Sequence, residues 1–267
     1  MKTIYTILPI YDSLIKRDNS RTNSLVPVYC PRQRLSSWQY NTEAIVVGAV
    51  TRIDLVDKNG NLRDITTYFT TLSDSVVLTI GTYYKYDGDT LLTQLPFGIY
   101  YLKITHANGY YFYSDWLSVE DMYPIFGTYT PNFIRIDFHN TNDLGDIYYR
   151  NGFTQTVWLR TQLAPPLHEP VEVLEEKNGI SIIEKIVTKF KFRLYVHVGR
   201  ELYRALIRLP QHDTITITDE VGNIYTPKIG NVWVNPINWN TFDTGTLEIL
   251  WNDNSEFVWV SNNANLT

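Results

Sequence analysis

The stretch that most constrains the fold runs from Leu95 to Ile104 and has the sequence Leu-Pro-Phe-Gly-Ile-Tyr-Tyr-Leu-Lys-Ile. Gly98 permits a tight bend, and Tyr100, two residues later, can turn its ring inward and donate its hydroxyl to the preceding loop. Ala107-Asn108-Gly109 then suits a hairpin turn with positive φ, before a second strand. The stretch predicts the corner of an immunoglobulin-like β-sandwich and contains no catalytic group.

The composition also favours strands. Aromatic residues make up 14% of the 267 residues, and Tyr alone accounts for 20 of them. Such side chains fit a pleated sheet better than a helix, and the length allows one large or two medium domains. We therefore predict a mainly β chain with two β-sandwich (Ig-like) domains, an extended N-terminal arm and one short helix in the C-terminal domain.

Changes in the hydrophobic pattern give the predicted boundaries. Residues 1–42 show no sustained period and form the N-terminal arm. Residues 43–122 alternate short strand patterns with turns and form the Ig-like β-sandwich. Residues 123–267 form the second β-rich domain, which follows an aperiodic segment with two prolines.

One convincing helix is expected in the second domain, near residues 200–209, and Pro210 should end it. Its apolar residues share one face; they are Leu202, Ala205, Leu206 and Leu209. The prolines of residues 164–170 predict an irregular loop there. We expect a hairpin from 172–176 and 180–187 after this loop, and a separate strand over 190–198.

The N-terminal arm has two possible arrangements. It either lies over its own domain or hooks a neighbouring subunit and orders on contact. In the second arrangement its aromatic and arginine residues are candidate assembly contacts: Tyr11, Arg17, Tyr29, Arg32, Arg34 and Trp38. Removal of residues 1–40 would then leave folded monomers that do not assemble.

Charge and cysteine content exclude several classes of function. The net charge is −5, so we expect no attraction to nucleic acid and no sequence-specific binding to it. The lone cysteine, Cys30, can form neither an internal disulfide nor a zinc site by itself. No stretch approaches the roughly 20 apolar residues of a membrane span, and the N-terminus lacks the pattern of a signal peptide.

No motif of catalytic type is present. The five histidines are scattered without metal-ligand spacing, and most are expected at turns or on the surface. Glu172, Glu175, Glu176 and Glu184 could place two carboxylates across a hairpin, as glycosidases require, but a solvated acidic face is the favoured interpretation. We expect no enzyme activity, no catalytic residue, no cofactor and no metal.

Short phrases along almost the whole chain, in order, resemble structural proteins encoded by phages and prophages of Bacteroidetes, including the crAss-like phages. The phrases lie at residues 8–12 with 17–19, 95–102 with 113–115, 133–140, 203–209, 213–218 and 222–225. The resemblance implies a virion protein of the collar, rings or tail, made in the bacterial cytoplasm. It also implies a symmetric ring between portal and tail, twelvefold or sixfold, that contacts other neck or tail proteins, the portal among the candidates.

The alternative function is a carbohydrate-binding or adhesin-like module of a phage tail or cell surface. Tyr110 to Tyr113 with Trp116 could stack on sugar rings. Alternating tyrosines in a sheet are more often half-buried wall positions or part of a protein interface. The virion interpretation therefore takes precedence.

Overall fold

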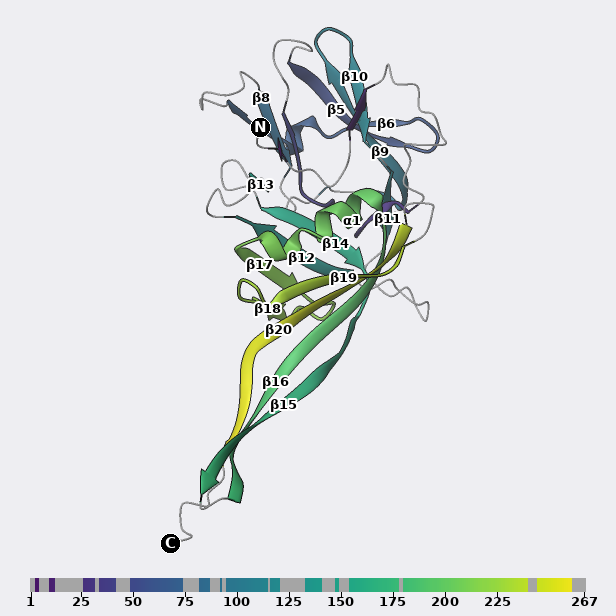
Figure 1. Ribbon diagram of the computed structural model, residues 1–267. Coiled ribbons are helices and arrows are strands. Elements are labelled where there is room, and N and C mark those ends of the chain that lie inside the picture. Colours follow the sequence, from purple (N-terminus) through teal and green to yellow (C-terminus); the bar gives the residue numbers. More distant parts are fainter. Residues whose placement is uncertain are drawn as a thin grey trace.

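The computed structural model describes residues 3–4, 10–12, 26–31, 34–41, 49–73, 82–86, 92, 95–114, 116–120, 133–140, 147–148, 154–177, 180–239 and 244–260. Within these residues the chain is mainly β, with several sheets and one short α-helix, as predicted. Figure 1 shows two groups of strands that form the body and a long ribbon that leaves it.

The first group of strands contains a seven-stranded sheet and a three-stranded sheet. In the larger sheet the order is β2-β10-β9-β11-β3, and β5 pairs with β9 and β6. Its strands are β2 Ile10–Asp12, β3 Val28–Pro31, β5 Val50–Asp57, β6 Leu62–Asp64, β9 Gly98–His106, β10 Tyr111–Ser114 and β11 Leu117–Glu120. The smaller sheet, of order β4-β8-β7, consists of β4 Trp38–Asn41, β7 Thr70–Ser73 and β8 Thr82–Tyr86, and a 3-10 helix, Thr66–Tyr68, precedes β7.

The bend at Gly98 and the hydrogen bond from Tyr100 to the preceding loop are present as predicted. The hydroxyl of Tyr100 donates a hydrogen bond of 3.0 Å to the carbonyl of Pro96, and Gly98 has a φ of +149°. β9 then buries alternate residues, including Leu102 and Ile104, and turns at Gly109 (φ +84°) into β10. This corner therefore fixes which face of β9 is buried in the core.

The second group contains two four-stranded sheets, of order β14-β12-β17-β18 and β15-β16-β20-β19. The first sheet comprises β12 Phe133–His139, β14 Gln155–Arg160, β17 Thr214–Thr218 and β18 Ile224–Tyr225. The second comprises β15 Leu163–Lys177, β16 Ile180–Gly199, β19 Val232–Trp239 and β20 Thr244–Val260. A separate parallel pair joins β1 Thr3–Ile4 to β13 Ile147–Tyr148.

The helix expected near residues 200–209 is confirmed as α1, Arg200–Leu206. All four residues of its predicted apolar face are buried, and Pro210 lies in the 3-10 helix Leu209–Gln211 that follows. The same hydrophobic cluster includes Leu206, Ile136 of the second group and Ile104 of the first. The two groups of strands therefore share a continuous core.

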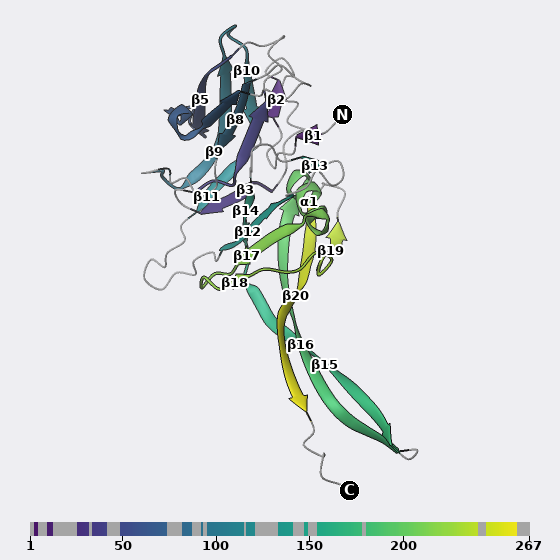
Figure 2. The same ribbon diagram turned by 90° about the vertical axis from the view of Figure 1, so that its left-hand side faces the viewer.

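The prediction of an irregular loop at residues 164–170 is wrong. β15 continues through these residues for 15 residues, and β16 is one strand of 20 residues where we expected two. β15 is an edge strand, so prolines, which lack an N–H, can be accommodated there. The register also shifts between Ala164 and Leu167, next to Pro165 and Pro166. Figures 1 and 2 show the resulting β15–β16–β20 ribbon extending away from the body.

One turn occurs twice, with the sequence Asp-x-x-Gly-Asn. It joins β5 to β6 at Asp57–Asn61 and β17 to β18 at Asp219–Asn223. In both, the Oδ1 atom of Asp accepts hydrogen bonds from the N–H groups two and four residues later. The Asn side chain donates to Oδ2 of the Asp, and the Gly has positive φ. The two halves therefore contain the same hairpin, a likeness that sequence analysis missed.

We predict that Asp219→Ala destabilises the protein by about 1–3 kcal/mol, because it leaves backbone N–H groups without their acceptor in a half-buried turn. Asp219 is 8% exposed, and its Oδ2 also accepts from Tyr225. Asp57→Ala is the matched control in the exposed copy of the turn, where water can replace the carboxylate, and should cost less. Urea unfolding measures both changes, and an equal or larger loss for Asp57→Ala would contradict this account.

Candidate functional site

The structure places four of the six candidate assembly residues. Tyr11 lies in β2, opposite Tyr113, and Trp38 lies in β4, opposite Tyr86. Tyr29 lies in β3, and Arg34 lies in the segment that follows β3. Arg17 and Arg32 lie outside the described residues.

Tyr29 and Arg34 contact β14 of their own chain. The guanidinium of Arg160 lies 5.1 Å from the ring centre of Tyr29, and Arg160 Nε is 3.0 Å from Glu120 Oε2. Arg34 lies 5.9 Å from the ring centre of Trp158. Burial raises the pKa of Glu120, and the cation of Arg160 opposes this shift. These contacts join the two groups of strands within a single molecule.

Ser37 connects the same segment to β14 by a set of buried hydrogen bonds. Its N–H donates to the carbonyl of Thr156, and its Oγ accepts from the N–H of Thr156. The side-chain amide of Gln155 donates to the carbonyl of Ser37 at 2.8 Å and to its Oγ at 2.9 Å. The segment therefore lies along the free edge of β14, which favours the arrangement in which the arm covers its own chain.

This arrangement changes the expected effect of removing residues 1–40. Val28, Cys30 and Leu35 belong to the hydrophobic core, and β3 pairs in parallel with β11. The truncated chain would expose this core, so loss of folding is now the expected result. Whether the arm also contacts a neighbouring subunit stays a prediction.

Most of the histidines were expected at turns or on the surface, and His168 and His197 are exposed, but two others are buried. His106 is 1% exposed and packs against Phe112, and His212 is 1% exposed and packs against Phe138 with ring centres 4.7 Å apart. Nδ1 of His212 faces the carbonyls of Arg208 and Leu209 at 3.0 and 3.2 Å. Burial lowers the pKa of His212, against the opposing effect of these carbonyls.

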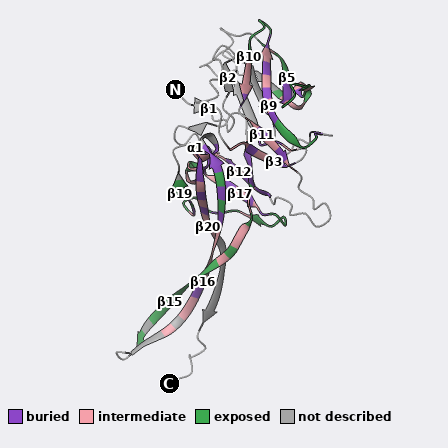
Figure 3. Ribbon diagram, turned by 90° about the vertical axis from the view of Figure 1, so that its right-hand side faces the viewer, coloured by how far each residue is buried: buried purple, intermediate pink, exposed green. Residues whose placement is uncertain are grey.

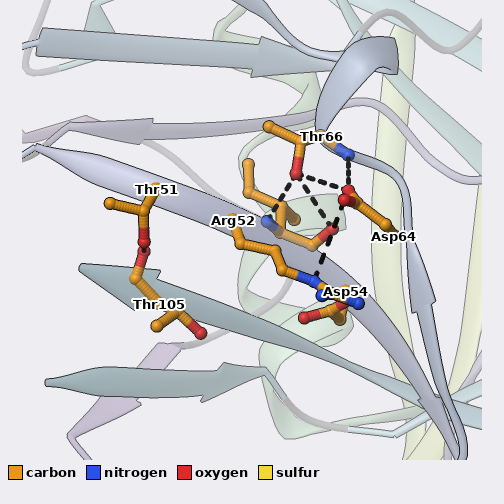
Figure 4. A network of polar contacts seen from close by, with 7 residues as sticks. Thr51, Arg52, Asp54, Asp64, Thr66 and Thr105 are labelled. Atoms are coloured by element: carbon orange, nitrogen blue, oxygen red, sulfur yellow. Dashed lines mark hydrogen bonds and ion pairs between the residues drawn. The ribbon is translucent and has the colours of Figure 1, made fainter. Parts of the chain in front are cut away.

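A polar network covers part of β5 and β6 (Figure 4). Arg52 binds Asp54 with its Nε and Nη2 atoms at 2.7 Å, and its Nε lies 3.8 Å from Asp64. Thr66 donates to Asp64 from both its hydroxyl and its N–H, and these bonds lower the pKa of Asp64. The hydroxyl of Thr66 also accepts from the N–H of Ile53. These contacts connect β5, β6 and the following 3-10 helix, so the network has a structural explanation.

The tyrosines considered for sugar binding form a continuous row of rings. Tyr113 contacts Tyr101 and Tyr111, and Tyr101 contacts Trp116, with centroid distances of 5.1 to 5.2 Å and steep angles between the rings. The ammonium of Lys103 lies 4.9 Å from the ring centre of Tyr111. The rings therefore pack edge to face against one another, which is the geometry of mutual packing. Tyr111, 36% exposed, is the member most open to solvent.

Exposed apolar side chains gather on the distal ribbon, which we define as residues 167–176 of β15, 181–191 of β16 and 252–260 of β20. Figure 3 shows that exposed and intermediate residues dominate its described part, in contrast to the buried strands of the body. Leu167, Val171, Val173 and Leu174 are 36%, 48%, 40% and 57% exposed. Apolar groups gathered in this way on a surface are typical of an interaction site.

Strand register defines one face of the distal ribbon, which we call the valine face. Val171 lies opposite Val187, Val173 opposite Lys185, and Glu169 opposite Lys189. Opposite residues of an antiparallel pair project from the same side, and so do alternate residues. Sequence analysis followed the glutamates of β15 and missed these valines, although the order Val171-Glu172-Val173 was a signal that could have found them.

Several kinds of site are absent from the described part of the chain. It holds no group of three or more His, Cys, Asp or Glu residues that could bind a metal ion, and no helix long and apolar enough to cross a membrane. Comparison with known proteins found no matching family model, curated protein or solved structure. The candidate site therefore rests on the distal ribbon and its chemistry.

Because the pKa of His212 is lowered by burial, we predict that stability falls as the pH drops below about 6.5, where the unfolded chain takes up a proton that the folded chain rejects. His212→Gln should flatten this slope. Urea midpoints between about pH 8 and pH 5 measure the effect. An unaltered slope in His212→Gln would assign the pH dependence to other groups.

Proposed function

We propose that this chain is a structural subunit of a phage virion, in the collar, a ring or the tail between portal and tail. The observation that supports it best is the distal ribbon, a long narrow projection with an exposed apolar face. Such a surface suits contacts with other proteins, because exposed apolar groups gathered on one face are typical of an interaction site.

Assembly is favoured because apolar side chains of β15 on the distal ribbon are exposed to water. An isolated two-stranded hairpin is marginally stable at best in water, and independent stability requires three or more strands with an apolar face, or packing against another element. In the body, β16 buries Leu194, Val196 and Val198. Along the ribbon it still buries Val187, but its partner β15 leaves Val171 and Val173 substantially exposed. Cover from a neighbouring protein would remove these side chains from water and order the ribbon.

We also propose that each group of strands is a β-sandwich, the first of them Ig-like. Support for the first comes from the Tyr100–Pro96 corner and from Tyr86 of the small sheet, which belongs to the same core as Ile53 of the large sheet. In the second group, Ile136 and Ile249 come from different sheets and belong to that core as well. The repeated Asp-x-x-Gly-Asn hairpin adds support for related architectures in the two halves.

The sequence phrases that resemble phage structural proteins support a place for this chain in a virion, as part of a symmetric oligomer. Among closed symmetries, a ring of twelve or six copies would suit a position beside the portal, with the portal or other neck and tail proteins as neighbours. The chain would be made in the bacterial cytoplasm and reach the virion by assembly. No enzymatic step is part of this proposal.

The alternative, a carbohydrate-binding or adhesin-like module, is supported by the row of Tyr101, Tyr111, Tyr113 and Trp116. Glycan-array binding that is lost in Tyr111→Ala and Trp116→Ala, with unchanged thermal stability, would favour it. The edge-to-face packing leaves few ring faces open for stacking on a sugar, so the virion proposal takes precedence.

We predict that purified particles contain this chain in a fixed small whole-number ratio to the portal protein. Quantitative mass spectrometry of purified virions measures the ratio. Absence from the particles would contradict the proposal and promote the carbohydrate-binding alternative.

We predict that virions incorporate less of the Val173→Asp variant than of the unchanged chain, because the substitution introduces a charge on the surface that assembly would bury. The monomer should stay folded, since substitutions at exposed sites usually change stability by less than about 0.5 kcal/mol. Leu62→Asp is the matched control: Leu62 is 50% exposed and lies on β6 of the other half. If both variants lost incorporation equally, the loss would not be specific to the distal ribbon, and this result would contradict the prediction.

A further inference from the structure

We propose that the occupant of the valine face is a second copy of this chain, which contributes its β17–β18 hairpin. This inference rests on the proposed function, since it names the partner of the distal ribbon within a symmetric assembly. Val171 and Val173 of one copy would pack on Val221 and Ile224 of the next, and Lys185 and Lys189 would face Glu220.

The valine face combines apolar and basic groups. Val171 and Val173 are 48% and 40% exposed, and Lys185 and Lys189 occupy the neighbouring strand on the same face. Lys189 is exposed and Lys185 is half-buried. Of the acids on this face, Glu169 has Lys191 Nζ at 3.4 Å, and Glu256 lies opposite Lys189 in β20. Lys185, by contrast, lies between Val173 of β15 and Val260 of β20. A partner for this face therefore needs aliphatic side chains flanked by a carboxylate.

The β17–β18 hairpin presents that chemistry. Val221 and Ile224 are 78% and 67% exposed. Glu220, which directly precedes Val221, is exposed as well. Asp219 holds the turn rigid by accepting hydrogen bonds from Val221 and Asn223. A rigid hairpin presents its apolar side chains without a further loss of conformational entropy on binding.

The two surfaces cannot meet within one molecule as it is folded. Figures 1 and 2 show β18 on the body, at the base of the ribbon, and the tip of the β15–β16 hairpin at the far end. Glu220 Oε2 lies 3.4 Å from the N–H of Leu163, the first residue of β15, which places the hairpin beside that base. Two different complementary patches on one chain give a head-to-tail contact, and such contacts generate rings or filaments.

Disulfide trapping tests the contact, and the native cysteine does not interfere. Cys30 is fully buried, and burial raises its pKa to about 11, so it stays an unreactive thiol under mild oxidation. Val173→Cys and Ile224→Cys are prepared as separate full-length chains, mixed and oxidised. We expect a covalent dimer in the mixture and none from either variant alone.

Charge reversal supplies the matched control. Lys185→Glu combined with Lys189→Glu on the Val173→Cys chain should abolish the cross-link, because three carboxylates would then meet. Glu220→Lys on the Ile224→Cys chain should restore it. Restoration requires opposite charges across the contact, which a general loss of folding could not reproduce.

The outcomes distinguish this inference from the proposed function. Cross-links of Val173→Cys chains with one another, or oligomers by sedimentation velocity without the mixed cross-link, would overturn the head-to-tail pairing. A chain that remains monomeric while virions contain it in a whole-number ratio to the portal would also overturn it, and would assign the valine face to another virion protein. Absence from virions would instead defeat the proposed function itself.

Discussion

The rest of the second half depends on the continuity of β16, which belongs both to the core and to the distal ribbon. Near α1 its alternate residues Leu194, Val196 and Val198 are buried, and β20 pairs with it from Lys185 to Gly199, with one register shift. The core therefore anchors one end of a strand whose other end has far less apolar cover. The end of β16 that is buried in the core keeps the exposed end in register, because strand slippage would move every core residue to the wrong face.

The N-terminal segment performs a comparable task for the two groups of strands. β3 adds a parallel strand to the first group, and Ser37 then satisfies backbone groups at the edge of β14 in the second. Arg34 and Arg135 both lie within 6 Å of the ring centre of Trp158, so cations flank one buried aromatic residue at this junction. The relative position of the two groups is thus held by hydrogen bonds and aromatic contacts in addition to the shared core.

The parts of the fold that sequence analysis predicted are those set by local chemistry. The Gly98–Tyr100 corner and the apolar face of α1 each depend on a few neighbouring residues, so their patterns were sufficient. The parallel pairing of β3 with β11 joins residues almost ninety positions apart, as Tyr29 opposite Ser118 illustrates, and no local period encodes it. The prolines of β15 misled the analysis because their effect depends on whether a strand lies at an edge, which only the assembled sheet decides.

For the candidate site as well, sequence analysis identified residues by type but could not predict which of them the fold brings together. The glutamates and the alternating valines of β15 were visible in the sequence, but only the register places Val173 opposite Lys185. The arginines and aromatics of the arm were visible too, yet Tyr29 and Arg34 contact their own β14, because proximity to Arg160 and Trp158 is a property of the fold.

The edges of the β15–β16–β20–β19 sheet favour contacts through faces over contacts through edges. β15 carries Pro170 and a register shift beside Pro165, and β19 carries Pro236 with a register shift before Asn238. β20 breaks its pairing with β16 between Asn252 and Glu256. Prolines and bulges at edges prevent the addition of further strands and so protect a sheet from open-ended aggregation. In the proposed assembly, many copies that expose apolar side chains on the distal ribbon would need this protection, and side-chain packing on a face would then allow binding that is specific and limited in extent.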